Sequence, residues 1–140
     1  MFITRATRRE HADVMELLTE HERGDADLAE GVTFIAREGA VVGCVRVVEV
    51  EPRTVVVDNV LVHAERRGEG VGRRLMETAM NSRGGTLYLC CHDDVIPFYA
   101  KFGFTLVALD EAPHSVVAYW EKIGDIPTDP NHVHHYMKAR

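Results

Sequence analysis

Two hydrophobic periods divide the chain into predicted strands and helices. Runs rich in valine and other apolar residues, bounded by glycine, proline or charged residues, predict strands. The predicted strands cover residues 2–6, 32–37, 41–50, 54–63, 86–91 and 104–109. Apolar residues spaced three and four positions apart predict helices instead, because one helical turn takes 3.6 residues. The predicted helices cover residues 8–22, 70–82 and 95–101, with a shorter one over 26–30.

Several boundaries carry their own signals. Thr7 followed by Glu10 is a capping box at the start of the first helix. Pro97 suits the first turn of the helix over 95–101. The pattern weakens near the C-terminus: residues 116–123 fit helix or strand, 125–131 form a loop, and 132–138 predict a last strand.

Connection lengths predict the topology. The strands over 32–37, 41–50 and 54–63 follow one another through short turns, which predicts an antiparallel meander. The strands over 54–63 and 86–91 flank a helix, so they should run parallel with a right-handed crossover. We therefore expect one α/β domain of the α+β type over residues 1–140, with a mixed sheet and helices on both faces.

Composition and charge narrow the function. The chain has 140 residues, of which 46% are hydrophobic and 27% charged, and its net charge is −6. This balance indicates a folded domain, and an acidic one is a poor general partner for nucleic acid or an anionic membrane. No apolar stretch is long enough to cross a bilayer, and the N-terminus has no signal-peptide pattern. Three cysteines give no disulfide framework, so we expect a cytoplasmic protein.

The strongest chemical signal is the run Arg67-Gly68-Glu69-Gly70-Val71-Gly72, between a predicted strand and a predicted helix. A helix N-terminus offers unpaired N–H groups and a partial positive charge, and glycines let an anion approach the backbone. The run therefore predicts a phosphate cradle. Its spacing matches neither the Rossmann nor the P-loop motif. A glycine-rich turn without a ligand is the alternative.

Together with a second motif, this run resembles the GCN5-related N-acetyltransferase (GNAT) family. Arg67, Gly70 and Gly72 fill that family's R/Q-x-x-G-x-G/A signature, and Gly68 is also in its usual place. The run from Pro97 to Phe104 resembles its second signature, a short helix with Phe-Tyr followed by Gly-Phe. The resemblance covers residues 2–110 and leaves 110–140 as a variable, substrate-side tail.

The resemblance implies a fold and a cosubstrate. The fold would be a GNAT fold, a mostly antiparallel sheet splayed at its centre, with acetyl-CoA in the gap. The pyrophosphate would meet backbone N–H groups from Gly68 to Arg73, and the pantetheine would pair with the strand edge at Val60–Val62. The implied cofactor-binding residues are Val60, Leu61, Val62, Arg67, Gly68, Glu69, Gly70, Val71, Gly72 and Arg73.

Acetyl transfer to an amine needs an acid for the leaving thiolate and a route for the amine proton. Tyr99 matches the family tyrosine often assigned as the general acid; the alternative is a core or rim tyrosine. Asp58 is a candidate base, because strand alternation would put it on one face with Val60 and Val62. The alternative is a structural carboxylate satisfied by a neighbour, with the base replaced by a water chain or by the fallback pair Glu49 and Glu51.

Other polar residues carry weaker hypotheses. Cys90 stands where relatives that acetylate protein N-termini have a glutamate, which disfavours that substrate class. A nucleophilic cysteine beside His92 is disfavoured, because adjacent strand residues point to opposite faces. His63 and His92 could form a polar rim or a proton relay. The histidines at positions 132, 134 and 135 lack a placed third metal ligand, so we expect no metal.

The sequence thus predicts an acetyl-CoA-dependent N-acetyltransferase that acts by direct transfer. The acceptor would be a small-molecule amine or a basic side chain, and the acidic charge balance favours a cationic one. The alternatives are a protein or peptide acetyltransferase and a non-catalytic acyl-CoA-binding module. The tail over 110–140 could also pair with a second subunit in a homodimer.

Overall fold

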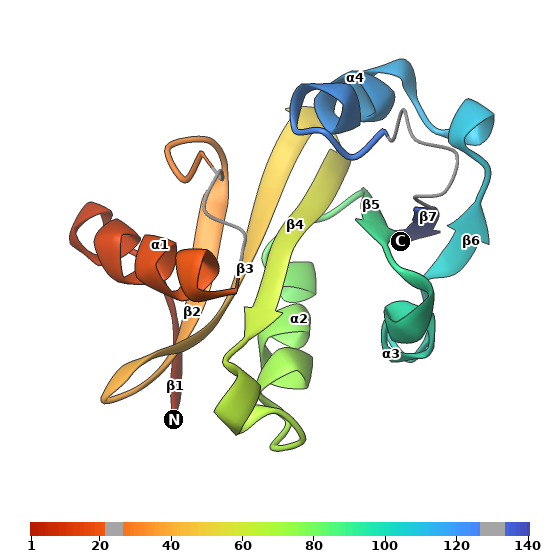
Figure 1. Cartoon of the computed structure of the whole chain (residues 1–140). Helices are drawn as coiled ribbons and strands as arrows, with labels where there is room; N and C mark the ends of the chain where they lie inside the picture. Colours follow the sequence, from red (N-terminus) through yellow and green to blue (C-terminus); the bar gives the residue numbers. More distant parts are fainter. Residues whose placement is uncertain (22–26, 127–133) are drawn as a thin grey trace. The chain divides into compact units, whose positions relative to one another are not determined.

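The structure is a computed structural model that describes residues 1–21, 27–126 and 134–140. The chain divides into two compact units (Figure 1). The first contains Met1–Val48 and Val57–Arg83, and the second contains Glu49–Val56 and Gly84–Arg140. Each unit is considered by itself below.

Seven strands of the described residues form one mixed sheet in the order β1-β2-β3-β4-β5-β7-β6. The strands are β1 (Phe2–Arg5), β2 (Val32–Glu38), β3 (Ala40–Glu51), β4 (Thr54–Val62), β5 (Thr86–Cys91), β6 (Thr105–Val107) and β7 (His135–Ala139). Antiparallel pairing joins β1 to β2, β2 to β3, β5 to β7 and β6 to β7. Strands β4 and β5 pair in parallel, with Thr54 opposite Thr86 and Val56 opposite Tyr88. This confirms the predicted α+β class and its mixed, mostly antiparallel sheet.

Four α-helices and four short 3-10 turns connect the strands within the described residues. The α-helices are α1 (His11–Glu20), α2 (Val71–Asn81), α3 (Ile96–Ala100) and α4 (His114–Lys122). The 3-10 turns are η1 (Arg8–Glu10), η2 (Ala64–Arg66), η3 (Asp93–Val95) and η4 (Leu109–Glu111). Ahead of α1, the Glu10 carboxylate accepts hydrogen bonds from the backbone and hydroxyl of Thr7, as the capping pattern predicts.

In the first unit, α1 and α2 cover opposite faces of the sheet. The apolar side of α1 packs on β2, β3 and β4 in a cluster of buried residues: Val14, Leu17, Leu18, Leu28, Ile35, Val41, Cys44 and Leu61. Neighbouring strand residues point to opposite faces, so Gly43 faces away from Cys44 and that cluster. A Cβ on Gly43 would meet Leu75 and Val71 of α2 at 2.9 and 3.1 Å. This strand glycine lets α2 approach the sheet closely.

The second unit has a core centred on Trp120 of α4, which is fully buried. Its ring lies 4.6 Å from that of Tyr136 on β7 and 6.5 Å from that of Tyr88 on β5, between centroids. Val116 on α4 is also fully buried. The segment over 116–122 is therefore helical, with Ile123 just beyond the end of α4, and its apolar positions 116, 119 and 120 share one face.

Three sequence predictions change in detail. Residues 27–30 form turns and a bend rather than a helix, and residue 26 lies outside the described residues. The strand predicted over 104–109 shortens to Thr105–Val107. The last strand begins at His135 rather than at 132, although 132 and 133 lie outside the described residues.

Candidate functional site

The glycine run forms an exposed loop at the start of α2, in the first unit. Gly68 and Gly70 both have φ +82°, a left-handed conformation that side chains rarely adopt. An added Cβ would meet nothing within 4 Å at either position. Glycine is therefore favoured here by the left-handed backbone rather than by tight packing, and the space next to the loop is open.

The backbone donors of the first turn of α2 are those that a phosphate needs. The N–H of Arg74 donates to the carbonyl of Gly70 over 3.1 Å, which is the first hydrogen bond of the helix. The N–H groups of Val71, Gly72 and Arg73 come before it and have no acceptor inside the helix. Gly70 is the N-cap of α2 and has no side chain that could accept from them. The turn thus presents donors and the positive end of a helix dipole.

The arginine side chains at the start of this loop hydrogen-bond to neighbouring strands and to the loop itself. Arg66 donates to the Glu69 carboxylate over 3.0 Å and to the Glu38 carboxylate over 2.8 Å. The hydrogen bond from Arg66 lowers the pKa of Glu38, and bonds to both carboxylates raise the pKa of Arg66. Arg67 donates back to the carbonyl of Val62 over 3.2 Å. The loop is thereby tied to the β2 end and to the end of β4.

The remaining basic side chains near the loop have protein partners. Arg73 lies 3.6 Å from the Glu77 carboxylate, one helical turn further along α2. Arg74 donates to the carbonyl of Met1 over 3.4 Å. Both side chains lie on the exposed side of α2. In this arrangement the arginine side chains are directed to protein partners, and the backbone of the loop carries the N–H groups that could receive an anion.

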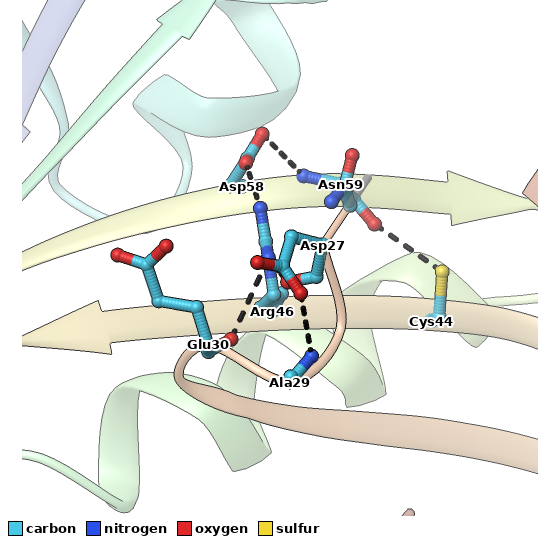
Figure 2. A network of polar contacts seen from close by, with 7 residues as sticks. All are labelled: Asp27, Ala29, Glu30, Cys44, Arg46, Asp58 and Asn59. Atoms are coloured by element: carbon cyan, nitrogen blue, oxygen red, sulfur yellow. Dashed lines mark hydrogen bonds and ion pairs between the residues drawn. The ribbon is translucent and has the colours of Figure 1, made fainter. Parts of the chain in front are cut away.

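Asp58 belongs to a partly buried polar network in the first unit (Figure 2). Its Oδ2 accepts from Nη2 of Arg46 over 2.8 Å, and its Oδ1 accepts from the backbone N–H of Asn59 over 2.8 Å. Arg46 is 2% exposed, and its Nη1 donates to the backbone carbonyls of Asp27 and Glu30. The network connects β3 and β4 to the turn that precedes β2.

A break in β4 alters the predicted alignment of its side chains. Asn59 has φ +51°, and its carbonyl accepts from the Cys44 thiol over 3.3 Å. Leu61 lies in the α1-side cluster with Cys44, and Asp58 contacts Arg46, which shares the face of Cys44 on β3. Asp58 and Leu61 are therefore on one face although three positions separate them. The prediction that Asp58, Val60 and Val62 share a face is wrong, because the left-handed residue between them shifts the alternation.

Around the break, the predicted pantetheine-binding residues differ in burial. Leu61 is 5% exposed and belongs to the core, whereas Val60 and Val62 are half-buried. A buried Leu61 side chain can still leave its backbone groups accessible, which is what the predicted main-chain pairing requires. The fallback carboxylates Glu49 and Glu51 are exposed, and Glu51 accepts from the Thr54 hydroxyl over 3.5 Å.

Tyr99 is on α3, in the second unit, and is 8% exposed. Its ring contacts those of Phe98 and Phe104 edge-on, with centroids 5.1 and 6.0 Å apart. Its carbonyl accepts from the N–H groups of Phe102 and Phe104, and these bonds end α3 and hold the segment that follows it. The ring is thereby fixed in an aromatic cluster, which a general acid requires of its scaffold.

The cysteines and nearby histidines of the second unit form structural contacts. Burial and the charges of Asp94 and Asp93 raise the pKa of Cys91 to about 11, so its thiol stays protonated at neutral pH. The carbonyl of Asp125 accepts from Tyr136 over 2.9 Å, from His134 over 2.9 Å and from Cys90 over 3.9 Å. His92 lies edge-on to His134, with ring centroids 5.2 Å apart.

Residues 1–21, 27–126 and 134–140 contain no group of three His, Cys, Asp or Glu side chains that could hold a metal ion. The histidine at position 132 lies outside them, and His135 pairs with Asp93. Over the same residues, no helix is long and apolar enough to span a membrane.

Sequence reasoning missed Arg46, and it placed Arg66 in a basic cluster around the loop without naming its carboxylate partners. Arg46 lies inside a valine-rich strand, where a lone charged residue signals a buried partner. Arg66 stands three residues before Glu69, a spacing that permits an ion pair across one turn. Neither local signal indicates that Arg46 pairs with Asp58 or that Arg66 pairs with Glu38, because these carboxylates are on other elements.

Comparison with known proteins identifies the family. The profile of the acetyltransferase (GNAT) domain matches residues 29–106, more than half of the chain and parts of both units. The chain therefore belongs to the GNAT acetyltransferase family, a family of acyltransferases. A search of curated protein sequences gives no significant match.

Solved structures share the fold at low identity. Rv2747 from Mycobacterium tuberculosis in complex with CoA is 17% identical, covers 99% of this chain and 98% of its own, and has a TM-score of 0.73. An acyl-CoA N-acyltransferase from Pseudomonas aeruginosa is 18% identical, with coverages of 99% and 97% and a TM-score of 0.69. N-acetylglutamate synthase from Neisseria gonorrhoeae, with CoA and N-acetyl-glutamate, is 17% identical over all of this chain and 35% of its own, with a TM-score of 0.74.

Proposed function

We propose that this protein is an acetyl-CoA-dependent N-acetyltransferase that transfers the acetyl group directly to a primary amine. The observation that carries the proposal is the loop before α2, where Gly68 and Gly70 are left-handed and exposed. They stand ahead of the first-turn N–H groups, which have no acceptor inside the helix. A pyrophosphate fits these donors by charge and geometry. Family membership and the CoA held by the Mycobacterium tuberculosis protein support the same cosubstrate.

In the proposed reaction, the neutral amine attacks the thioester carbonyl carbon and forms a C–N bond. The tetrahedral intermediate then loses the CoA thiolate as the C–S bond breaks. Tyr99 is the proposed acid that gives its phenolic proton to the thiolate, because Tyr99 matches the family motif and is held by Phe98 and Phe104. The amine gives up its own proton on the way to the amide.

Asp58 remains the proposed acceptor of the amine proton, and its pairing with Arg46 gives it a second, structural task. Both carboxylate oxygens already accept one hydrogen bond, from Arg46 and from Asn59. These bonds fix the orientation of the carboxylate that would take the proton.

The acceptor is proposed to be a small-molecule amine, and the net charge of −6 favours a cationic one. The Neisseria gonorrhoeae enzyme, which shares this fold, holds N-acetyl-glutamate, a small acetylated amine. The test is release of free CoA from acetyl-CoA with a panel of small amines, polyamines, amino acids and lysine peptides. Turnover with small amines is expected. Turnover with peptides alone would indicate a protein acetyltransferase, and binding without turnover a non-catalytic acyl-CoA module.

A further inference from the structure

Two histidines lie at the entry to the glycine loop, in the first unit. His21 follows the last residue of α1, and His63 follows the last residue of β4. Their rings meet edge-on, with centroids 5.5 Å apart and an interplanar angle of 75°. Three residues separate His63 from the run that begins at Arg67. The pair is therefore placed to influence the backbone that leads into the loop.

The hydrogen bonds of His21 define its charge state. Nδ1 lies 2.9 Å from the carbonyl of Leu17, which can only accept, so Nδ1 carries a proton. Nε2 lies 3.3 Å from the backbone N–H of Ala64, which can only donate, so Nε2 offers its lone pair. Both bonds form only when the imidazole is neutral. A residue at the end of α1 thus holds the first residue of η2, which is 43 positions away in the chain.

His63 also acts as an acceptor, with the opposite tautomer. Its Nδ1 accepts from the backbone N–H of Glu65 over 3.1 Å and caps η2. The proton of its neutral ring is consequently on Nε2, which lies 3.9 Å from the carboxylate of Glu20. Its backbone is anchored separately, because the N–H of His63 donates to the carbonyl of Val42 on β3 over 2.8 Å.

We propose that His21 and His63 are positioning residues for the acyl-CoA loop, and that their neutral rings set the turn from which the loop departs. Protonation would place a hydrogen on Nε2 of His21 and on Nδ1 of His63. The N–H groups of Ala64 and Glu65 would then face donors instead of acceptors. The turn η2 loses both restraints, and acyl-CoA binding weakens as pH falls. This inference rests on the proposed function for the role of the loop, but not for the two hydrogen bonds.

Within the described residues, the charged and polar groups that face the pair come from α1, η2 and β3. From α1, Glu20 is the charged side chain that faces His63, and it can accept from Nε2 whether the ring is neutral or charged. From η2, Glu65 contributes its backbone N–H, and the Arg66 side chain is directed to Glu38 and Glu69. From β3, the neighbour is the backbone carbonyl of Val42. Histidine is the residue whose charge ordinarily changes between about pH 5 and 8.

The first experiment needs no ligand. Backbone amide resonances of Ala64 and Glu65 are followed by NMR from about pH 8 to about pH 5, in the wild-type protein and in His21→Gln and His63→Asn. A Gln amide can replace the Nε2 acceptor, and an Asn amide can replace the Nδ1 acceptor at an N-cap, but neither titrates. We expect both amides to titrate in the wild type, the Ala64 response to vanish in His21→Gln, and the Glu65 response to vanish in His63→Asn. Amides that stay constant with pH would overturn the proposal, whatever CoA does.

The second experiment measures CoA binding by calorimetry at about pH 7.5 and about pH 5.5. The phosphate monoester of CoA titrates in the same range. The quantity compared between proteins is therefore the ratio of the Kd at the lower pH to the Kd at the higher pH. We expect the wild-type ratio to exceed that of the His21→Gln/His63→Asn variant by about tenfold, since two backbone hydrogen bonds are lost. His21→Leu lacks the acceptor and should bind CoA more weakly at both pH values, and Gln at this position should restore much of that loss.

His114→Gln is the matched control, because His114 is an exposed histidine of the second unit at the start of α4. It should keep the wild-type ratio. Equal ratios in the wild type and the double variant would overturn the proposal. If the amides titrate as expected but CoA binds at neither pH, the failure lies in the proposed acyl-CoA function. Circular dichroism at both pH values confirms that each protein stays folded.

Discussion

The guanidinium of Arg46 donates to the carboxylate of Asp58 over 2.8 Å, between neighbouring strands and with Arg46 only 2% exposed. Breaking a buried pair by removing one partner leaves an uncompensated charge, whereas removing both can be nearly neutral. Asp58→Asn should therefore lower the free energy of unfolding by about 3 kcal/mol. Asp58→Asn combined with Arg46→Met should recover a large part of that loss. Urea unfolding of the single and double variants measures both effects.

The same variants separate the chemistry of Asp58 from its structural task. If Asp58 accepts the amine proton, the double variant should be stable yet slow, with low kcat/KM at neutral pH. Activity should partly return at high pH, where more of the amine is already neutral. CoA affinity serves as the check that the site is intact. A stable double variant with wild-type kcat/KM and an unchanged pH profile would remove Asp58 from the reaction and leave a water relay.

The loop before α2 gives a second prediction. Gly70→Asp adds a Cβ at φ +82° and a carboxylate beside the unbonded N–H groups of α2. Both changes oppose a bound phosphate, so CoA binding should fall below detection by calorimetry. Gly124→Asp is the matched control, because Gly124 has φ +81° and equally open space at its Cβ. Undiminished CoA binding by folded Gly70→Asp would place the cosubstrate elsewhere.

Tyr99 gives a third prediction. Tyr99→Phe keeps the ring contacts with Phe98 and Phe104 and removes only the hydroxyl. If that hydroxyl protonates the thiolate, kcat should fall by about 100-fold while CoA affinity stays near the wild-type value. Tyr136→Phe removes the hydroxyl of a second buried tyrosine, on β7, and should leave kcat unchanged. A kcat within about threefold of wild type would assign the proton to another donor.

Tyr136 gives a prediction for stability at alkaline pH. Burial, with smaller contributions from Cys90 and Asp125, raises the pKa of Tyr136 from 10.0 to about 12. Between these values the unfolded tyrosine loses its proton while the native one keeps it, so the contribution of Tyr136 to stability declines as pH rises. The stability advantage of wild type over Tyr136→Phe should be full at about pH 9 and smaller at about pH 11.

Urea unfolding of both proteins at the two pH values provides that measurement. The pKa of Cys91 is also raised, to about 11, but Cys91 is present in both proteins and cancels in the difference. The tyrosinate absorbance of the native proteins offers an independent reading, since the wild type should ionise one tyrosine late. A stability difference that stays constant across this range would contradict the assignment.

The local sequence was sufficient to predict most elements and the phosphate loop. Helix α2 and strand β5 lie within one residue of their predicted bounds, because apolar periodicity and glycine position depend on near neighbours. The run from Arg67 to Gly72 has the exposed, left-handed glycines that an anion cradle needs. The short helix predicted over 26–30 is not formed by residues 27–30, because a distant residue acts on this segment. The side chain of Arg46 donates to the carbonyls of Asp27 and Glu30.

Tertiary structure decided the partners of the polar side chains. Arg46 meets Asp58 across 12 positions, Arg66 meets Glu38 across 28, and His21 meets Ala64 across 43. The left-handed Asn59, which sets the face of Asp58, is likewise bonded to Cys44 of another strand. A sequence pattern repeats with the period of one element, so it tells which face of that element is apolar. It carries no information on which side chain of a distant element will face a given charge, because that depends on how the strands and helices pack.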